Sequence, residues 1–90
     1  MIYKLFIPDN VKQQISDYKK SGNISAYNKI FTLLSELEQH PKTGTGKPEQ
    51  LKYKPGNIWS RRINNEHRLI YSICDDKVIV AVISAKGHYE

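Results

Sequence analysis

Two arginines, Arg62 and Arg68, flank a turn-forming stretch, residues 64–66, in a segment that alternates apolar and polar side chains. A three-residue hairpin loop would place the two guanidinium groups opposite each other on one face of the strand pair, whereas a two-residue loop would separate them. Facing arginines repel each other unless an anion lies between them, and planar guanidinium groups suit phosphate. We therefore favour a phosphate site, with pairing of each arginine to Glu49 or Glu66 as the alternative.

Glu49 stands between Lys47 and Lys52, and two nearby ammonium groups favour its ionised form. An ionised carboxylate beside a site for a polyanion is unfavourable unless it has a function there. The preceding residues 44–48 resemble a phosphate-binding loop only superficially. Such a loop needs Ser or Thr after its lysine and then a helix, and Pro48 stands there instead. A flexible connector is the simpler interpretation of this stretch.

His88 and Tyr89 follow closely after the most hydrophobic predicted strand. Histidine is the usual proton donor near neutral pH, and a tyrosine ring can stack on a nucleic-acid base. Terminal tails are usually disordered, but the strand would keep both side chains near the sheet. Both residues are therefore site candidates, with a disordered tail as the alternative.

Metal chemistry has little support in the sequence. The three histidines and the single cysteine, Cys74, show no spacing typical of metal ligands. Asp75 and Asp76 follow Cys74 directly, and their charges disfavour the reactive thiolate. We expect no metal, no cofactor and no cysteine nucleophile.

The charge of the chain points to a polyanionic partner. The net charge is +5 at neutral pH, and the pI is about 9.4. Seven basic residues fall between Lys42 and Arg68, where only Glu49 and Glu66 are acidic. A basic stripe on a small domain favours nucleic acid as the partner, and a solvated, solubilising surface is the alternative.

The composition is that of one soluble domain, which we assign to residues 1–90. Hydrophobic residues make up 39% and charged residues 26% of the chain. The longest apolar run, Val78–Ile83, is far shorter than the roughly 20 residues of a membrane span. A single cysteine and the lack of a recognisable leader lead us to expect a cytoplasmic protein without membrane contact.

The elements that would position these side chains follow from the spacing of apolar residues. We expect a strand over residues 1–7, and then a helix up to Gly22 that Asp9 or Asn10 caps. A second helix, capped by Ser25 and ended by Pro41, would bury a stripe formed by Tyr27, Ile30, Phe31, Leu34 and Leu37.

Strand-like runs follow at 50–54, 58–63, 68–74 and 77–84, the last one central, with Asp75-Asp76 as a tight turn. This order predicts an α+β fold: an N-terminal strand, a two-helix hairpin, and an antiparallel sheet of three to four strands. The helices would cover one sheet face, toward which Arg61 and His67 point. The other face would stay open and carry the polar residues.

Four segments resemble, in order and at matching spacing, the YoeB/Txe family among the RelE-like ribonuclease toxins. They are Gly46-Lys47-Pro48-Glu49-x-Leu51-Lys52, Trp59-Ser60-Arg61-Arg62-Ile63, Glu66-His67-Arg68-Leu69-Ile70-Tyr71 and His88-Tyr89. Residues 1–40 share only the general plan of a strand and two helices. Glu90 departs from the family pattern, which usually ends at the tyrosine.

The resemblance implies a RelE-like microbial ribonuclease fold and a toxin that cuts messenger RNA in the ribosomal A site. The cut would use the 2′-OH of the RNA and no metal. The catalytic residues implied are Glu49 as general base, His88 as general acid and Arg68 as a stabilising cation. Substrate binding would fall to Lys52, Arg62 and Tyr89.

The implied partners are a cognate YefM-like antitoxin that covers the active face and the ribosome with its messenger RNA. A second copy of the chain is a further candidate partner. Operator DNA would be reached only through the antitoxin. The alternatives are a non-catalytic module that binds RNA or DNA through the same basic face, and a simple protein–protein surface. A pure binder would need neither Glu49 nor His88.

Overall fold

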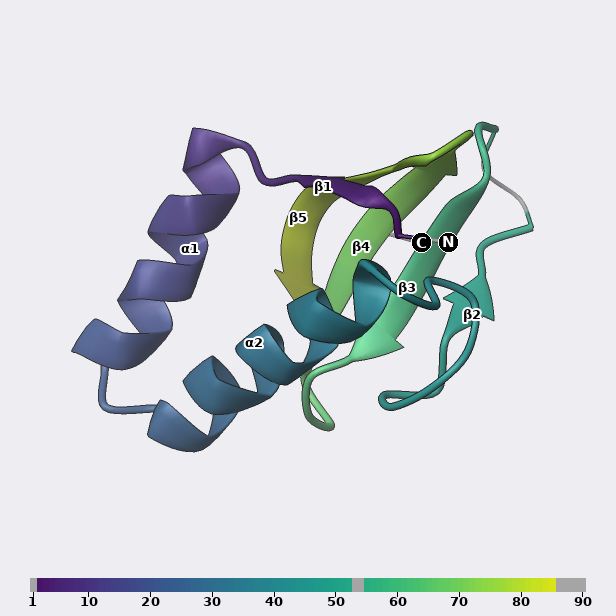
Figure 1. Ribbon diagram of the computed structural model, residues 1–90. Helices are drawn as coiled ribbons and strands as arrows, with labels where there is room; N and C mark the ends of the chain where they lie inside the picture. Colours follow the sequence, from purple (N-terminus) through teal and green to yellow (C-terminus); the bar gives the residue numbers. More distant parts are fainter. Residues whose placement is uncertain (1, 53–54, 86–90) are drawn as a thin grey trace.

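Two helices lie on one face of a five-stranded sheet in the computed structural model, which describes residues 2–52 and 55–85 (Figure 1). The helices are α1 (Asp9–Lys20) and α2 (Ile24–Leu37). The strands are β1 (Lys4–Phe6), β2 (Glu49–Gln50), β3 (Ile58–Arg62), β4 (His67–Cys74) and β5 (Lys77–Ala85). The predicted α+β fold, with a helix pair on one side of the sheet, is confirmed. Neither of these helices is long and apolar enough to cross a membrane.

The strand order is β1-β5-β4-β3-β2, and every pairing is antiparallel except that of β1 with β5. The sheet is therefore mixed, whereas the sequence predicted an antiparallel set. The chain runs from β1 through both helices to β2 at the far edge and returns through hairpins, so its last strand meets its first. This path makes β4 the central strand, and β5 lies beside it.

The long strands agree with the predicted bounds to within one residue, and the short ones do not. β1 has three residues instead of seven, and β2 consists of Glu49–Gln50 instead of a run beginning at Gln50. Both are edge strands, which one neighbour stabilises instead of two. The predicted tight turn after β4 is present, with Asp75 in a left-handed conformation at φ 54°.

The predicted helix caps were wrong in both helices. Pro8 is the N-cap of α1 and makes no side-chain hydrogen bond, and Asp9 falls in the first helical turn, where its charge favours the positive end of the helix. In α2 the cap is Asn23, whose side chain accepts a hydrogen bond of 3.4 Å from the amide of Ala26. Ser25 lies inside the helix because the connection between the helices is very short.

The core lies between the helices and the sheet. Its fully buried members include Val11, Ile30, Leu33, Leu37, Leu69, Tyr71, Val78 and Val80. Each such burial contributes roughly 1.5–3 kcal/mol. Phe31, predicted in the buried stripe of α2, is 48% exposed and instead packs edge-on against Tyr27. Leu33, two residues further along α2, is fully buried in the core instead.

The second face of the sheet is only partly open, in contrast to the prediction. Alternation along β4 directs Leu69 and Tyr71 to the core and Arg68 and Ile70 to this second face. Ile70 is nevertheless 1% exposed. The polar positions of this face therefore surround a buried apolar residue on the central strand.

Candidate active site

The β3–β4 hairpin places Arg62 and Arg68 directly opposite each other. The two residues are register partners, and in the turn Asn64 Oδ1 accepts hydrogen bonds of 2.8 Å from the amides of Glu66 and His67. Register partners point to the same side of a sheet, which here is the side away from the helices. The hairpin therefore has the geometry that favours a phosphate site.

Glu49 joins the same face through the short strand β2. It is the register partner of Ser60, which precedes Arg62 by two residues on β3. Diagonal neighbours of this kind have Cα atoms about 7–8 Å apart. Both Glu49 and Arg62 are exposed, and among the described residues no ion pair joins Arg62 to Glu49 or Glu66. Glu49 and Arg62 thus lie as diagonal neighbours on one sheet face, with no ion pair between them.

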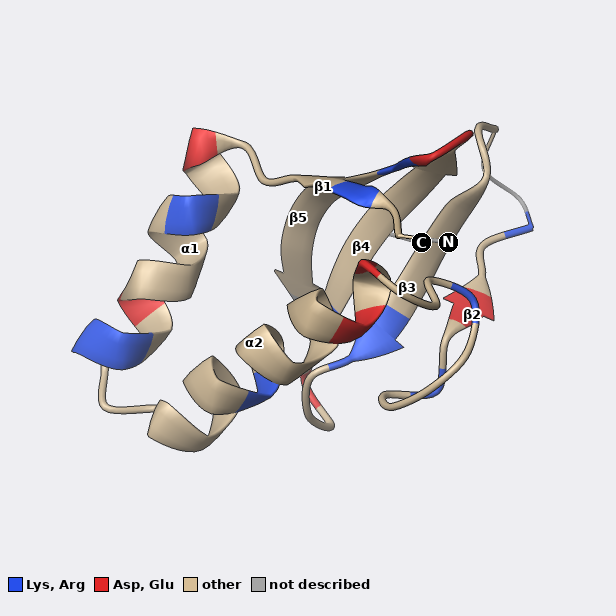
Figure 2. Cartoon of the chain, viewed as in Figure 1, with Lys and Arg blue, Asp and Glu red and all other residues tan. Residues whose placement is uncertain are grey.

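Lysines flank this carboxylate along the chain. Lys47 precedes Glu49, Lys52 follows it, and both lysine side chains are exposed. Figure 2 shows β2 as an acidic segment between basic ones, at the sheet edge beside the basic end of β3. Cations on both sides of one carboxylate suit a polyanion together with a proton acceptor.

His88 and Tyr89 lie outside the described residues, so their roles stay predictions. β5 ends at Ala85, and its Ser84 is the register partner of Arg68. The segment predicted to carry the acid therefore continues from the strand that borders Arg68.

Two other residues of reactive types are His67, whose Nδ1 atom is buried without a hydrogen-bond partner among the described residues, and Cys74. His67 lies on the helix side, as predicted, and packs edge-on against Tyr18 with ring centroids 5.5 Å apart. Cys74 is a free, exposed thiol at the end of β4. Within residues 2–52 and 55–85, no three His, Cys, Asp or Glu side chains gather into a set that could hold a metal ion.

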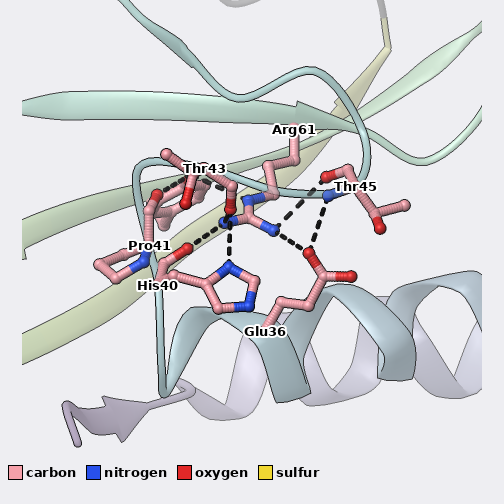
Figure 3. A network of polar contacts seen from close by, with 7 residues as sticks. Glu36, His40, Pro41, Thr43, Thr45 and Arg61 are labelled. Carbon is pink, nitrogen blue, oxygen red and sulfur yellow. Dashed lines mark hydrogen bonds and ion pairs between the residues drawn. The ribbon is translucent and has the colours of Figure 1, made fainter. Parts of the chain in front are cut away.

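Arg61 points to the opposite side from Arg62 and is fully buried beneath a loop. Its Nη1 atom pairs with Glu36 of α2 at 2.8 Å (Figure 3). Its Nη2 atom donates to the carbonyl oxygens of His40 and Thr43 at 2.6 and 2.7 Å. One guanidinium group therefore ties helix α2 and the loop after it to strand β3.

Tyr71 of β4 extends this network. Its hydroxyl accepts a hydrogen bond of 3.2 Å from Arg61 Nε and donates one of 2.6 Å to the carbonyl oxygen of Pro41. Burial raises the pKa of this hydroxyl, although the hydrogen bond and charge of Arg61 oppose the effect. Tyr71 thus remains protonated and able to donate at neutral pH.

Glu36 is shared between the guanidinium group and the loop. The amide of Thr45 donates to Glu36 Oε1 at 2.8 Å, the same oxygen that binds Arg61. Burial alone would raise the pKa of Glu36, but hydrogen bonds from Thr45 and the bond and charge of Arg61 outweigh it and lower the pKa below its ordinary 4.5. We name Arg61, Glu36, Tyr71 and the loop they bind, residues 40–46, the Arg61 anchor.

Two glycines let the loop of the anchor pack closely against Glu36 and the backbone of β3. A Cβ atom at Gly44 would collide with Glu36 Oε1, and one at Gly46 would lie 2.8 Å from the carbonyl oxygen of Arg62. Gly46 has a φ of 85°, and its carbonyl oxygen accepts the amide of Arg62 at 2.7 Å. The loop therefore ends against the backbone of Arg62, directly before the segment that carries Glu49.

The Arg61 anchor was not predicted from the sequence, and the part of its loop expected to be a flexible connector is instead held by hydrogen bonds. A signal was present, because Arg61 alternates with Trp59 and Ile63 on the core-facing side of β3. A buried charge needs partners. The partners are mostly backbone carbonyls of the loop, and residue types do not reveal these.

The comparisons with known proteins agree with this architecture. The sequence profile described as "YoeB-like toxin of bacterial type II toxin-antitoxin system" matches residues 10–89. The class is thus that of the toxins of bacterial type II toxin–antitoxin systems. Within it, the chain belongs to the YoeB-like family.

Relatives of this chain include the Toxin YoeB of Escherichia coli K12, which is 43% identical over 61 residues, 68% of this chain and 70% of that protein. The YoeB dimer from Staphylococcus aureus has a TM-score of 0.78 at 29% identity and covers 99% of this chain and 100% of its own. A heterotetrameric YoeB–YefM toxin–antitoxin complex from the same organism has a TM-score of 0.74 at 29% identity, with the same coverage.

Proposed function

We propose that this toxin is an endoribonuclease that cuts messenger RNA in the ribosomal A site. The observation that carries the proposal is the meeting of Glu49, Arg62 and Arg68 on one sheet face. A carboxylate beside two opposed guanidinium groups suits a phosphodiester whose own 2′-OH is the nucleophile. A protein that only binds nucleic acid would have no need of the carboxylate.

Each step of such a cut has a residue assigned to it. Glu49 accepts the proton of the 2′-OH, and the oxygen then attacks the adjacent phosphorus. Arg68 and Arg62, with Lys52, stabilise the charge that builds on the five-coordinate phosphorus. His88 protonates the 5′-oxygen as the bond to it breaks, and Tyr89 contacts the RNA. The products are a 2′,3′-cyclic phosphate and a 5′-hydroxyl, which balances protons and bonds.

The ribosome has a physical part in this proposal. A carboxylate flanked by cations is a weak base, and a site on a sheet face offers little to orient a flexible strand by itself. Holding the reactants in line can contribute about 7–11 kcal/mol toward lowering a barrier. The A site would supply that orientation.

The proposed partners follow from the similar structures. A YoeB–YefM complex among them supports a YefM-like antitoxin that covers the active face, and a YoeB dimer supports self-association. Operator DNA would be bound only through the antitoxin. We assign the protein to the cytoplasm, where ribosomes and messenger RNA occur.

The test is a reconstituted translation reaction with a defined codon in the A site and the same RNA free in solution. Ribosome-bound RNA should be cut at that codon and free RNA only poorly. Glu49→Gln should lose the activity, and Glu66→Gln, which removes an exposed carboxylate from the nearby turn, should keep it. Tight, salt-sensitive binding without any cut would instead support the non-catalytic binding module.

A further inference from the structure

We infer that the Arg61 anchor is a positioning device that sets the place of Glu49 relative to Arg62 and Arg68. This inference rests on the proposed function, because it concerns how the catalytic carboxylate is held. Glu49 itself belongs to a two-residue edge strand and is exposed. So short a strand has few contacts of its own to fix a side chain. Its position must come from the chain on either side.

The loop of the anchor, residues 40–46, lies shortly before Glu49 in the chain and is held by several hydrogen bonds. Arg61 and Tyr71 together bind the carbonyl oxygens of His40, Pro41 and Thr43 at 2.6 to 2.7 Å. Arg61 Nη1 also reaches Thr45 O at 3.4 Å. The loop carbonyls thus converge on two side chains that are themselves fully buried.

The far end of the loop is fixed to the site itself. The amide of Arg62 donates to Gly46 O at 2.7 Å, and the amide of Leu51 donates to Ile58 O at 2.8 Å. Glu49 lies between these two attachments, opposite Ser60. Backbone hydrogen bonds on both sides of Glu49 therefore link the loop and β2 to β3.

Arg61 and Arg62, which are adjacent on β3, make different contacts. Arg61 binds the loop on the helix side, and Arg62 presents its guanidinium group on the site side. A shift of β3 would carry the loop and Arg62 together, so the spacing between Glu49 and Arg62 would be preserved. β3 thus fixes the positions of both Glu49, the proposed base, and Arg62, a proposed phosphate-binding residue.

Stability alone does not account for this network. Replacing a buried ion pair by apolar residues of similar volume is often neutral or stabilising, because charges lose hydration on burial. Apolar residues in place of both Arg61 and Glu36 would avoid that cost, whereas an apolar residue at position 61 alone would leave Glu36 and the loop carbonyls unpaired. What an apolar residue cannot do is hold several carbonyl oxygens of one loop in fixed places.

Tyr71→Phe is the sharpest test, because it keeps the buried ring and removes only the hydroxyl between Arg61 and Pro41. A misplacement of about 1 Å can cost on the order of 10²-fold in rate. We expect kcat on ribosome-bound RNA to fall at least about tenfold. We expect KM to change little, because the surface cations that bind RNA are untouched. Arg61→Lys, which retains the charge but not the fork of donors, should act in the same direction.

A matched control separates position from stability. Ile15→Val trims a buried side chain of α1 outside the anchor. The variants are compared at equal distance below their own melting temperatures, and amide exchange is followed for Thr45, Arg62 and Leu51. In Tyr71→Phe these amides should exchange faster while those of β4 and β5 do not. Ile15→Val should alter neither kcat nor the three amides.

Two results would overturn the inference. One is a Tyr71→Phe protein with faster exchange at the three amides and an unchanged kcat. The other is a protein whose loop amides stay as protected as in the wild type, which would mean that the hydroxyl anchors nothing. A wild-type protein that fails to cut ribosome-bound RNA would overturn the proposed function instead, and the amide exchange would still report on the anchor.

Discussion

Neighbouring arginines on one strand lie in opposite environments in this protein. Arg61 is fully buried and binds a carboxylate and backbone carbonyls, whereas Arg62 is exposed opposite Arg68. The difference follows from the period of two along a strand, which sends successive side chains to opposite faces. From residue type alone, the two arginines would have been assigned to one basic patch. Their substitution should therefore have different consequences.

Arg68→Ala should remove activity and leave the fold intact. Losing one preorganised group that stabilises transition-state charge typically costs about 10²–10³ in rate. Lys12→Ala, which removes an exposed cation from α1, serves as the charge-matched control and should cut normally. Cleavage rates on programmed ribosomes and melting temperatures are measured side by side. A collapse of the Arg68→Ala melting temperature would show that Arg68 is structural.

The Glu49→Gln and His88→Gln variants should lose cleavage activity for different reasons. A 5′-bridging phosphorothioate substrate has a much better leaving group and needs no acid. It should largely rescue His88→Gln and leave Glu49→Gln slow, because general acids and bases each contribute about 10²–10⁴ in rate. Single-turnover rates with the sulfur and oxygen substrates check this. Rescue of Glu49→Gln alone would reverse the two assignments.

At the scale of elements, the Arg61 anchor determines where the edge strand β2 lies. The loop that connects α2 to β2 is tied to α2 by Glu36, to β3 by Arg61 and to β4 by Tyr71. A segment rich in glycine and lysine thereby gains a defined path without secondary structure of its own. The positive φ at Gly44 and Gly46 shows how tightly that path turns.

Glu36→Gln should reveal the contribution of this network through its pH dependence. The pKa of Glu36 is lowered in the folded protein, so its ionised form stabilises the fold fully above its ordinary pKa of 4.5. That contribution is lost as the pH falls through the lowered value. At pH 7 the variant should lose about 1–3 kcal/mol of unfolding free energy. The gap to the wild type should then narrow below pH 4.5.

Urea unfolding from pH 7 to pH 3 measures this gap. Glu38→Gln changes an exposed carboxylate just beyond the end of the same helix and is the matched control. A Glu36→Gln deficit that stays constant over the whole range would show that the charge of Glu36 is not what holds the loop.

The long elements could be predicted from the sequence because the runs around Trp59 and Tyr71 alternate and Val78–Ile83 is an unbroken apolar run. The facing of Arg62 and Arg68 depended on the loop length, which the sequence left open and the hairpin turn decides. The parallel pairing of β1 with β5 was missed because it joins segments from the two ends of the chain. The Arg61 anchor was missed because backbone carbonyls carry no sequence signal.

At the scale of the whole molecule, the proposed activity of an exposed face calls for a partner that covers it. The chain carries a net charge of +5, and the face with Arg62 and Glu49 is accessible. If this face cuts messenger RNA as proposed, it would damage its own host unless something covers it. The YoeB–YefM complex among the similar structures is consistent with a protein cover.

Co-expression with a cognate YefM-like antitoxin should therefore restore growth of cells that the toxin alone arrests. The pair should purify as a stable complex, and amides of Glu49 and Arg62 should gain protection in it. An Arg68→Ala toxin, expressed alone, should leave growth normal. Normal growth with the unaltered toxin expressed alone would contradict the toxic activity itself.

The most direct measurement of the central claim uses a single 2′-deoxy sugar in the ribosome-bound message, directly 5′ of the cut. If the RNA supplies its own nucleophile, the deoxy message should not be cut at that position, and the matched all-ribose message should yield a 5′ fragment ending in a 2′,3′-cyclic phosphate. Binding of the toxin to both complexes should be equal. Efficient cutting of the deoxy message would contradict the account, because Glu49 would then have no 2′-OH proton to accept.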